Sequence, residues 1–177
     1  SGIFAAHYIN TVSPTFLDEI VDGIHDFVEP QIRAELTNKK LAGCSTSILN
    51  APDPSYDPST DIALAANYTH DDPLAAKREN KMVLQEKMGL VVDPDAPLFF
   101  WPSRLDPVQK GCQLLAEILF EMVAEYRGEG LQVAVVANGS FQQHLHEIVD
   151  FHRLYDRVSV CGFGEQLSRL GYAGSDF

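Results

Sequence analysis

The feature that most constrains the fold is a regular alternation of apolar runs and helical patterns from residue 96 onward. The order is strand, helix, strand, helix, strand, helix, and the run "LQVAVVANG" at 131–139 reads as a buried strand. Strands that alternate with helices of this length are typical of βαβ units, a parallel sheet and right-handed crossovers. The sequence therefore predicts an α/β fold with a parallel sheet.

Residues 13–36 show a helical pattern that two breaking residues divide. Ser13 is a suitable N-cap, whereas Gly23 and Pro30 are expected to split the helix into two pieces. Short strands are predicted on either side, one ending near Ser13 and the other at Asn50.

A proline-rich stretch at 51–61 leads into a strong helical pattern at 72–90. The stretch is brief and contains Tyr56. We therefore interpret it as a loop rather than as a linker to a separate domain.

The composition excludes several classes of protein. The chain has 177 residues, 45% of them hydrophobic, and a net charge of −12, which disfavours binding to nucleic acid or to a membrane surface. Its three cysteines are far apart and form no CxxC pair, so neither a disulfide framework nor a zinc knuckle is expected and a reducing compartment fits best.

Every glycine-bearing turn of the predicted sheet lies at the carboxyl end of a strand. These turns are residues 103–111, 138–140 and 162–164. In parallel sheets, ligands bind outside the carboxyl ends of the strands. The three turns are therefore expected to form a ligand-binding edge.

The first turn carries two cations, Arg104 and Lys110, in an otherwise acidic chain. The planar guanidinium can grip two phosphate oxygens, and the ammonium is a compact point charge. A helix beginning near Gln109 would add the positive end of its dipole and free N–H groups. The stretch favours a diphosphate, and the alternative is a pair of solvated loop cations near Asp106. The Walker A pattern is absent, which disfavours a P-loop ATPase.

The last turn, "CGFGE", holds Phe163 between Gly162 and Gly164. It is a weak dinucleotide fingerprint, because Leu167 replaces the third glycine of GxGxxG. An exposed Phe163 could stack on a nucleobase, and the alternative is a phenylalanine of the core.

Other positions carry weaker signals. Asn50, at a strand end, could cap the following turn or reach a ligand at the sheet edge. Ser140 could cap the helix after the central strand. His144 and His146 lie two residues apart and so face different sides of a helix, and no HExxH pattern is present, so no metal site is expected.

Several phrases follow one another in the order and spacing of a known family. They are "YINTVSPTF", "ILNAPDPSYDPSTDIALAANY", "KRENKMVLQEKMGL", "PLFFWPSRLDPVQKG" and "LGYAGSDF". Over nearly the whole chain they resemble bacterial glycogen synthases and plant starch synthases, in which the typical phrases include "NTVSPTYAREI", "KxxNKxxLQxxLGL", "SRLxxQKG" and "YAGSDF". These are retaining glycosyltransferases of the GT-B fold.

The resemblance implies a donor site in this chain. Arg104 and Lys110 match the arginine and lysine that bind the diphosphate of the sugar nucleotide, and Asn50 matches an asparagine near the donor. One more residue separates Arg104 from Lys110 than in the commonest family version. "LNAPD" also replaces the usual "LNGID".

The resemblance also implies how the nucleotide is held. Phe163, beside Gly162, replaces a tyrosine that stacks on the donor base, which keeps the aromatic face and loses the hydroxyl. Asn138, Gly139 and Ser140 correspond loosely to a glycine turn that lines the nucleotide site.

The family's "KTGGL" loop and its glutamate-bearing "EPCGL" segment do not occur here, so the chain is expected to be a truncated fragment. Residues 1–50 would be the crossover strand, helices and entry strand, 51–95 a loop and linking helix, and 96–177 a partial Rossmann-like domain for the nucleotide-sugar. Retaining transfer requires a donor clamped between two domains with water excluded. The isolated chain is therefore predicted to be inactive.

The implied reaction is transfer of glucose from ADP-glucose or UDP-glucose to the non-reducing end of an α-1,4-glucan, which would bind through the missing N-terminal domain. No cofactor is expected, and the implied location is the cytoplasm or the plastid stroma. The alternatives are another GT-B hexosyltransferase and a non-catalytic nucleotide-binding module. Self-association through an exposed sheet edge is a further prediction.

Overall fold

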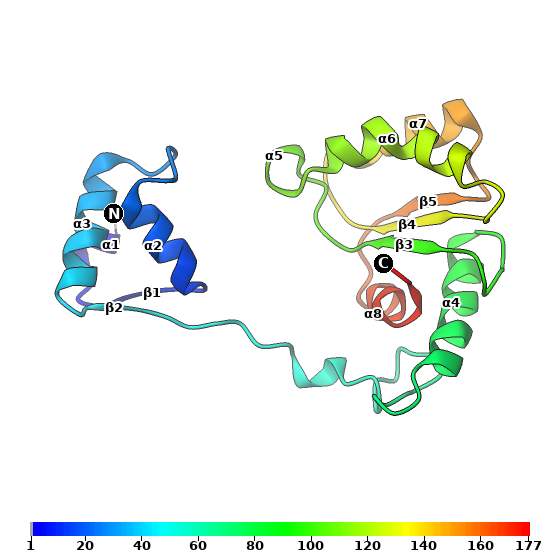
Figure 1. Cartoon of the computed structure of the whole chain (residues 1–177), viewed down its shortest axis with the longest axis horizontal. Helices are drawn as coiled ribbons and strands as arrows, with labels where there is room; N and C mark the ends of the chain where they lie inside the picture. Colours follow the sequence, from blue (N-terminus) through cyan, green and yellow to red (C-terminus); the bar gives the residue numbers. More distant parts are fainter. Residues whose placement is uncertain (1) are drawn as a thin grey trace. The chain divides into compact units, whose positions relative to one another are not determined.

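The computed structural model describes residues 2–177, and the chain divides into two compact units at Asp53 (Figure 1). The division falls inside the segment at 51–61, which was predicted to be a loop and not a linker to a separate domain. The second part of that prediction is wrong, because the chain passes there from one compact unit to the next. Within the described residues, no helix combines the length and the apolar character that crossing a bilayer requires. The functional domain boundaries stay a prediction.

The first unit is a small α/β arrangement. Its two strands are parallel neighbours, with Ile9 opposite Ser45 and Thr11 opposite Ser47. Its elements in chain order are α1 (Gly2–Ala5), β1 (Ile9–Thr11), α2 (Pro14–Asp22), α3 (Pro30–Leu41) and β2 (Ser45–Ser47).

The predicted break between the two helices of the first unit is confirmed. The Ser13 hydroxyl accepts the Phe16 N–H at 3.2 Å at the start of α2, and Gly23 ends that helix with φ of 81°. Pro30 is the first residue of α3.

The predicted end of the second strand is wrong, because β2 ends at Ser47 and not at Asn50. The Ile48 N–H still donates to the Thr11 carbonyl at 2.8 Å, but the segment that follows β1 then enters α2 at Pro14. Residues 48–50 therefore have no strand beside them.

The second unit contains the predicted alternation of strands and helices. A 3₁₀ turn at Pro54–Tyr56 and a long helix precede the first strand. The elements are α4 (Leu74–Met88), β3 (Leu98–Trp101), α5 (Pro107–Lys110), α6 (Cys112–Glu125), β4 (Gln132–Val136), α7 (Gln142–His152), β5 (Val158–Cys161) and α8 (Glu165–Gly174).

The sheet of the second unit is parallel, as predicted, with the order β3-β4-β5. All residues of the central strand β4 are buried, which explains why its sequence is a continuous apolar run rather than an alternating one.

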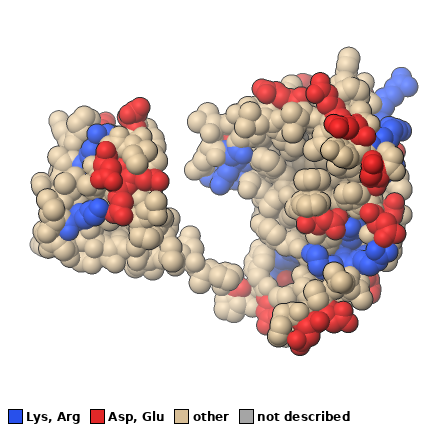
Figure 2. All heavy atoms as spheres, viewed as in Figure 1, with Lys and Arg blue, Asp and Glu red and all other residues tan. Residues whose placement is uncertain are grey.

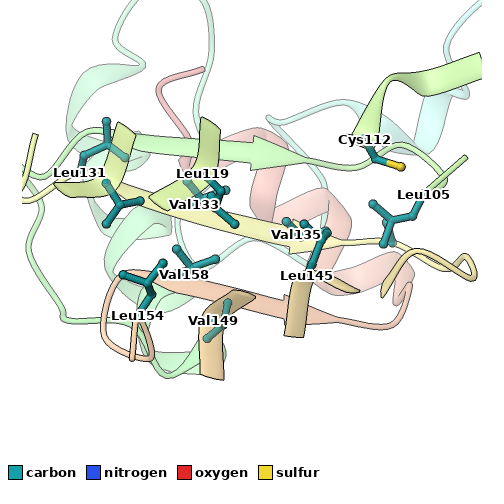
Figure 3. Packing of buried hydrophobic residues seen from close by; sticks show 12 residues of the cluster. Leu105, Cys112, Leu119, Leu131, Val133, Val135, Leu145, Val149, Leu154 and Val158 are labelled. Atoms are coloured by element: carbon teal, nitrogen blue, oxygen red, sulfur yellow. The ribbon is translucent and has the colours of Figure 1, made fainter. Parts of the chain in front are cut away.

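Helices cover both faces of this sheet (Figure 1). On one face Val133 and Val135 of β4 pack with Leu119 of α6 and Leu145 of α7, which Figure 3 shows from close by. On the other face, side chains of α4 and α8 pack against the intervening strand residues; this second cluster contains Leu84, Met88, Leu90, Leu98, Ala134, Val136 and Leu170.

The chain beyond α8 returns to the free side of β3. The Phe177 N–H donates to the Leu98 carbonyl at 3.3 Å, and the Phe177 carbonyl accepts the Phe100 N–H at 2.9 Å. This is the hydrogen-bond pattern of parallel neighbours. The crossover through α6 leads from β3 to one side and the crossover through α8 ends on the other, so β3 lies where the strand order reverses. In open α/β sheets that position is where ligands bind.

Candidate functional site

The loop that follows β3 is fixed to the core at Leu105. The Leu105 side chain is only 2% exposed and belongs to the cluster under α6 and α7. Its N–H donates to the Asn138 carbonyl at 3.0 Å, and the Trp101 indole Nε1–H donates to the Ser103 carbonyl at 2.8 Å. The loop that carries Arg104 is thereby joined to the turn after β4.

Gly139 allows this close approach. A Cβ atom at Gly139 would lie 2.5 Å from the Leu105 carbonyl oxygen, closer than Cβ atoms come in proteins. The backbone at Gly139 also has φ of 154°. Only glycine fits between the two turns without displacing backbone.

Asn138 joins the third turn to the same edge. Its side-chain Oδ1 accepts the Phe163 N–H at 2.9 Å, across from the end of β5. The turns after β3, β4 and β5 are therefore connected through Asn138, as the sequence predicts for the carboxyl ends of parallel strands.

The first two turns form an open hollow of about 320 Å³, which is at the lower end of the usual volumes of ligand pockets. Its lining brings together four of the predicted site residues. The lining residues are Arg104, Leu105, Asp106, Pro107, Asn138, Gly139 and Ser140.

The predicted helix start near Gln109 is wrong. The short helix α5 begins at Pro107, Gly111 ends it with φ of 70°, and the long helix α6 begins only at Cys112. The Asp106 Oδ1 accepts the N–H groups of Val108 and Gln109 at 3.0 and 2.9 Å. These two N–H groups are occupied by a carboxylate and are not free for a phosphate.

The two predicted cations differ in their surroundings. Arg104 is exposed, lines the hollow and donates from Nη2 to the Gln109 Oε1 at 2.8 Å. Lys110 is exposed at the end of α5 and is not among the lining residues. Figure 2 shows basic groups at the α5 corner of the second unit, on a surface where both signs of charge occur.

Phe163 is 55% exposed, so its ring is not a part of the core. It lies between Gly162 and the start of α8, on the turn that Asn138 holds. The structure leaves this aromatic face open at the carboxyl edge of the sheet, as a stacking role requires.

Two other predicted roles have different outcomes. Ser140 lines the hollow but does not cap α7, since the N-cap position is Phe141 and no side chain bonds there. A turn closed by the Gln142 N–H and the Gly139 carbonyl at 3.2 Å separates Ser140 from the helix. Asn50 lies in the first unit, exposed, after β2. Its role near a donor stays a prediction.

Sequence reasoning missed what the phrases "NKMVLQ" and "GSDF" do in the fold. The Lys81 Nζ, with a side chain 7% exposed, donates to both Asp176 carboxylate oxygens, at 2.9 and 2.6 Å, and to the Ala96 carbonyl at 3.1 Å. Asn80, fully buried, accepts the Ala65 N–H at 2.8 Å. The sequence signal for these contacts was the pair of adjacent polar residues, Asn80 and Lys81, in the middle of a predicted helix.

A second missed cluster joins the proline-rich loop to α8. Arg169 bonds the Asp61 carboxylate at 3.1 Å and the Glu165 carboxylate at 2.7 Å, and its guanidinium lies 4.0 Å from the Tyr56 ring centroid. The hydrogen bond to the Glu165 carboxylate raises the pKa of the Arg169 guanidinium. Residues 55–61 are thereby held to α8 within the second unit. Within the described part of the chain, no group of three or more potential metal ligands occurs.

Comparison with known proteins gives consistent relatives. The chain is 36% identical to a glycogen synthase of Bacillus licheniformis over 99% of its own length, and 34% identical to a glycogen synthase of Bacillus subtilis, also over 99%. A glycogen synthase of Erwinia tasmaniensis is 41% identical over 67% of the chain. The chain covers 34%, 35% and 24% of these relatives. It matches no protein-family model.

A solved structure shares the arrangement as well. The catalytic domain of starch synthase IV from Arabidopsis thaliana, bound to ADP and acarbose, superimposes with a TM-score of 0.78 at 28% identity. The superposition covers 99% of this chain and 34% of that one.

Proposed function

The chain belongs to the glycogen and starch synthase family, and we propose from that premise that its second unit holds the diphosphate of a nucleotide-sugar donor. The observation that carries the proposal is the hollow after β3 and β4, where Arg104 lies with Asn138, Gly139 and Ser140. A guanidinium beside backbone and side-chain donors is suited to phosphate oxygens. The similar starch synthase, whose structure holds ADP, supports an adenine nucleotide.

Arg104 and Lys110 would stabilise the leaving diphosphate. When the bond between sugar and phosphate breaks, negative charge grows on the diphosphate, and fixed cations lower the free energy of that state more than that of the bound substrate. Arg104 supplies a guanidinium at the hollow, and Lys110 supplies an exposed point charge at the end of α5. Two side-chain cations make a metal ion unnecessary for this step.

The base side of the nucleotide would lie on the turn after β5. The exposed Phe163 ring offers a face for stacking, and Asn138 fixes the backbone of that turn through the Phe163 N–H. Gly162 leaves room beside the Asn138 amide, since a Cβ atom there would lie 3.3 Å from Oδ1.

The whole protein would transfer glucose from ADP-glucose or UDP-glucose to the non-reducing end of an α-1,4-glucan, with retention. This chain spans about a third of the length of its relatives. The glucan and the other face of the donor would be bound by the remaining two thirds, so this chain alone is expected to bind nucleotide without transferring glucose. A cytoplasmic or plastid location stays a prediction.

Calorimetric titration of the 177-residue chain with ADP and with UDP tests the proposal. We expect saturable binding of at least one of them and a loss of about tenfold or more in Arg104→Ala, because a charged hydrogen bond contributes about 1.5–3 kcal/mol. A matched Arg153→Ala change, at an exposed arginine after α7, is expected to leave the affinity unchanged. Equal affinities in wild type and Arg104→Ala would refute the assignment. Glucose transfer by the 177-residue chain itself would overturn the expected division of labour.

A further inference from the structure

Arg104 has a neutral partner that was not recognised from the sequence. Its Nη2 donates to the Gln109 Oε1 at 2.8 Å; Arg104 precedes Asp106, the N-cap of α5, and Gln109 lies within that helix. A free arginine side chain carries about 2 kcal/mol of rotamer entropy, part of which must be lost when it grips a ligand. A partner that restrains Arg104 beforehand removes part of that loss.

The backbone of Gln109 is itself held in place by Asp106. The Asp106 carboxylate accepts the Gln109 N–H at 2.9 Å, and the Lys110 N–H donates to the Asp106 carbonyl at 2.9 Å. Pro107, the first residue of α5, has a fixed φ that suits the helical turn. Contacts therefore run from Asp106 through the Gln109 backbone to the Arg104 guanidinium.

Asp106 also lines the hollow, where its negative charge would repel a phosphate. Its Oδ1 accepts two N–H groups, those of Val108 and Gln109, which offsets part of its charge. The cationic residue of the hollow is therefore Arg104, and the orientation of its guanidinium decides how well an anion is held.

We propose that Gln109 is a positioning residue, which holds the Arg104 guanidinium at the edge of the hollow in the orientation that receives the donor diphosphate. The proposal rests on the function proposed above. Glutamine suits this task because its amide oxygen occupies one guanidinium N–H group and leaves the positive charge whole, whereas a carboxylate would neutralise it. Within "SRLDPVQKG", the turn begun by Asp106 and Pro107 brings Gln109 back to Arg104.

A double-mutant cycle measured by ADP titration tests whether Gln109 acts through Arg104. We expect Gln109→Ala to weaken ADP binding about three- to tenfold, as loss of one hydrogen bond does. In the Arg104→Ala background the same change is expected to have no further effect. Equal losses from Gln109→Ala in both backgrounds would show that it acts independently of Arg104 and would overturn the proposal.

Two further variants separate positioning from general damage. Gln109→Glu keeps the side-chain size and adds a charge that pairs with Arg104, so it is expected to weaken ADP binding more than Gln109→Ala does. Adenosine, which has no phosphate, is expected to bind all of these variants like the wild type, and Gln31→Ala, a change at an exposed glutamine of α3, is expected to bind ADP normally. A matching loss of adenosine affinity in Gln109→Ala would contradict a role through the diphosphate.

The restraint on Arg104 can also be measured without any nucleotide. In ¹⁵N relaxation of the Arg104 Nε–H, assigned by comparison with Arg104→Ala, we expect a more restricted group in wild type than in Gln109→Ala. Equal mobility in both would overturn the proposal whether or not ADP binds. A wild-type chain that binds no nucleotide but shows the restraint would instead refute the proposed function and retain the positioning of Arg104 by Gln109.

Discussion

The two units of this chain use the same kinds of element and differ in how those elements are covered. In the second unit a parallel sheet is packed by helices on both faces, and its central strand is wholly buried. In the first unit the two strands are three residues each, and the buried apolar side chains are those of Leu17, Ile20 and Leu36. Stability follows from the apolar surface that the layers enclose, and not from the presence of strands and helices.

The polar contacts differ in the same way. The second unit has buried polar side chains that are paired, such as Asn80, Lys81 and Gln85, while the first unit has pairs at its surface, such as Lys40 with Asp18. Buried pairs require one arrangement of the surrounding elements, whereas surface pairs tolerate several. The candidate anion site lies on the unit with the fixed arrangement.

The largest expected effect comes from separating the units at Asp53. Residues 54–177 expressed alone are expected to show a cooperative thermal transition by circular dichroism, because both sheet faces remain covered. Residues 1–53 alone are expected to melt without a cooperative transition, since so small a core rarely offsets the lost chain entropy. A cooperative melt of residues 1–53 would erase the contrast between the units.

A cavity in each core should reveal the same contrast in the intact chain. Leu119→Ala, at a fully buried position under α6, is expected to lower the free energy of unfolding of the second unit by about 2–5 kcal/mol. Leu36→Ala, in the first unit, is expected to leave that transition unchanged. Hydrogen exchange of the β4 amides measures the effect, and an equal loss from both variants would mean that the units unfold together.

Removal of the carboxylate at Asp176 should uncover the buried Lys81 charge. Asp176→Ala is expected to cost about 3 kcal/mol of unfolding free energy in urea, the lower end for a broken buried pair, because carbonyl acceptors remain at Pro94 and Ala96. The matched control is Asp95→Ala, which removes an exposed partner of Arg78. Loss of equal size in the control would show that the depth of the pair is irrelevant.

Gly139→Ala should affect the site more than the fold. The added Cβ would meet the Leu105 carbonyl at 2.5 Å, so the loop with Arg104 is expected to shift and ADP affinity to fall about tenfold, or about 1.4 kcal/mol. Gly128→Ala, where no atom lies within 4 Å of the added Cβ, is the control. Unchanged ADP affinity in Gly139→Ala would show that binding does not depend on the close approach of the two turns.

The smallest expected effect is the pH dependence of the exposed Asp95 pair. The hydrogen bond from Arg78 lowers the pKa of Asp95 from its ordinary value of 3.8. A carboxyl whose pKa is lower in the folded state stabilises the fold above its unfolded pKa and loses that contribution as the pH falls through the folded value. The small stability difference between wild type and Asp95→Ala should therefore shrink in urea melts as the pH falls below 3.8, and disappear once Asp95 is protonated in the folded state as well. A difference that grows with acidity would contradict the assigned sign.

The arrangement of the sheet could be predicted because its signals are local. The apolar run of β4, the breakers Gly23 and Pro30 and the glycine turns act within a few residues. The three turns at one edge then follow from strand direction alone, and the structure joins them through Asn138.

The wrong predictions and the missed residues depend on partners that are distant in the sequence. Strand β2 stops at Ser47 because the segment after its neighbour β1 becomes a helix. Lys81 is paired with Asp176, which lies 95 residues later in the chain. The contact of Gln109 with Arg104 depends on the Asp106 cap of the short helix α5. That cap was missed because a single helix was predicted to begin near Gln109. Spacing indicates where such residues lie but not which atoms they meet.

The most direct test of the central claim is a ¹H–¹⁵N spectrum of the 177-residue chain titrated with ADP. We expect the amides that shift to belong to the three turns at the carboxyl edge, residues 103–111, 138–140 and 162–164, and these shifts to vanish in Arg104→Ala. Shifts confined to other parts of the second unit, or unchanged by Arg104→Ala, would contradict the claim that this edge holds a nucleotide diphosphate.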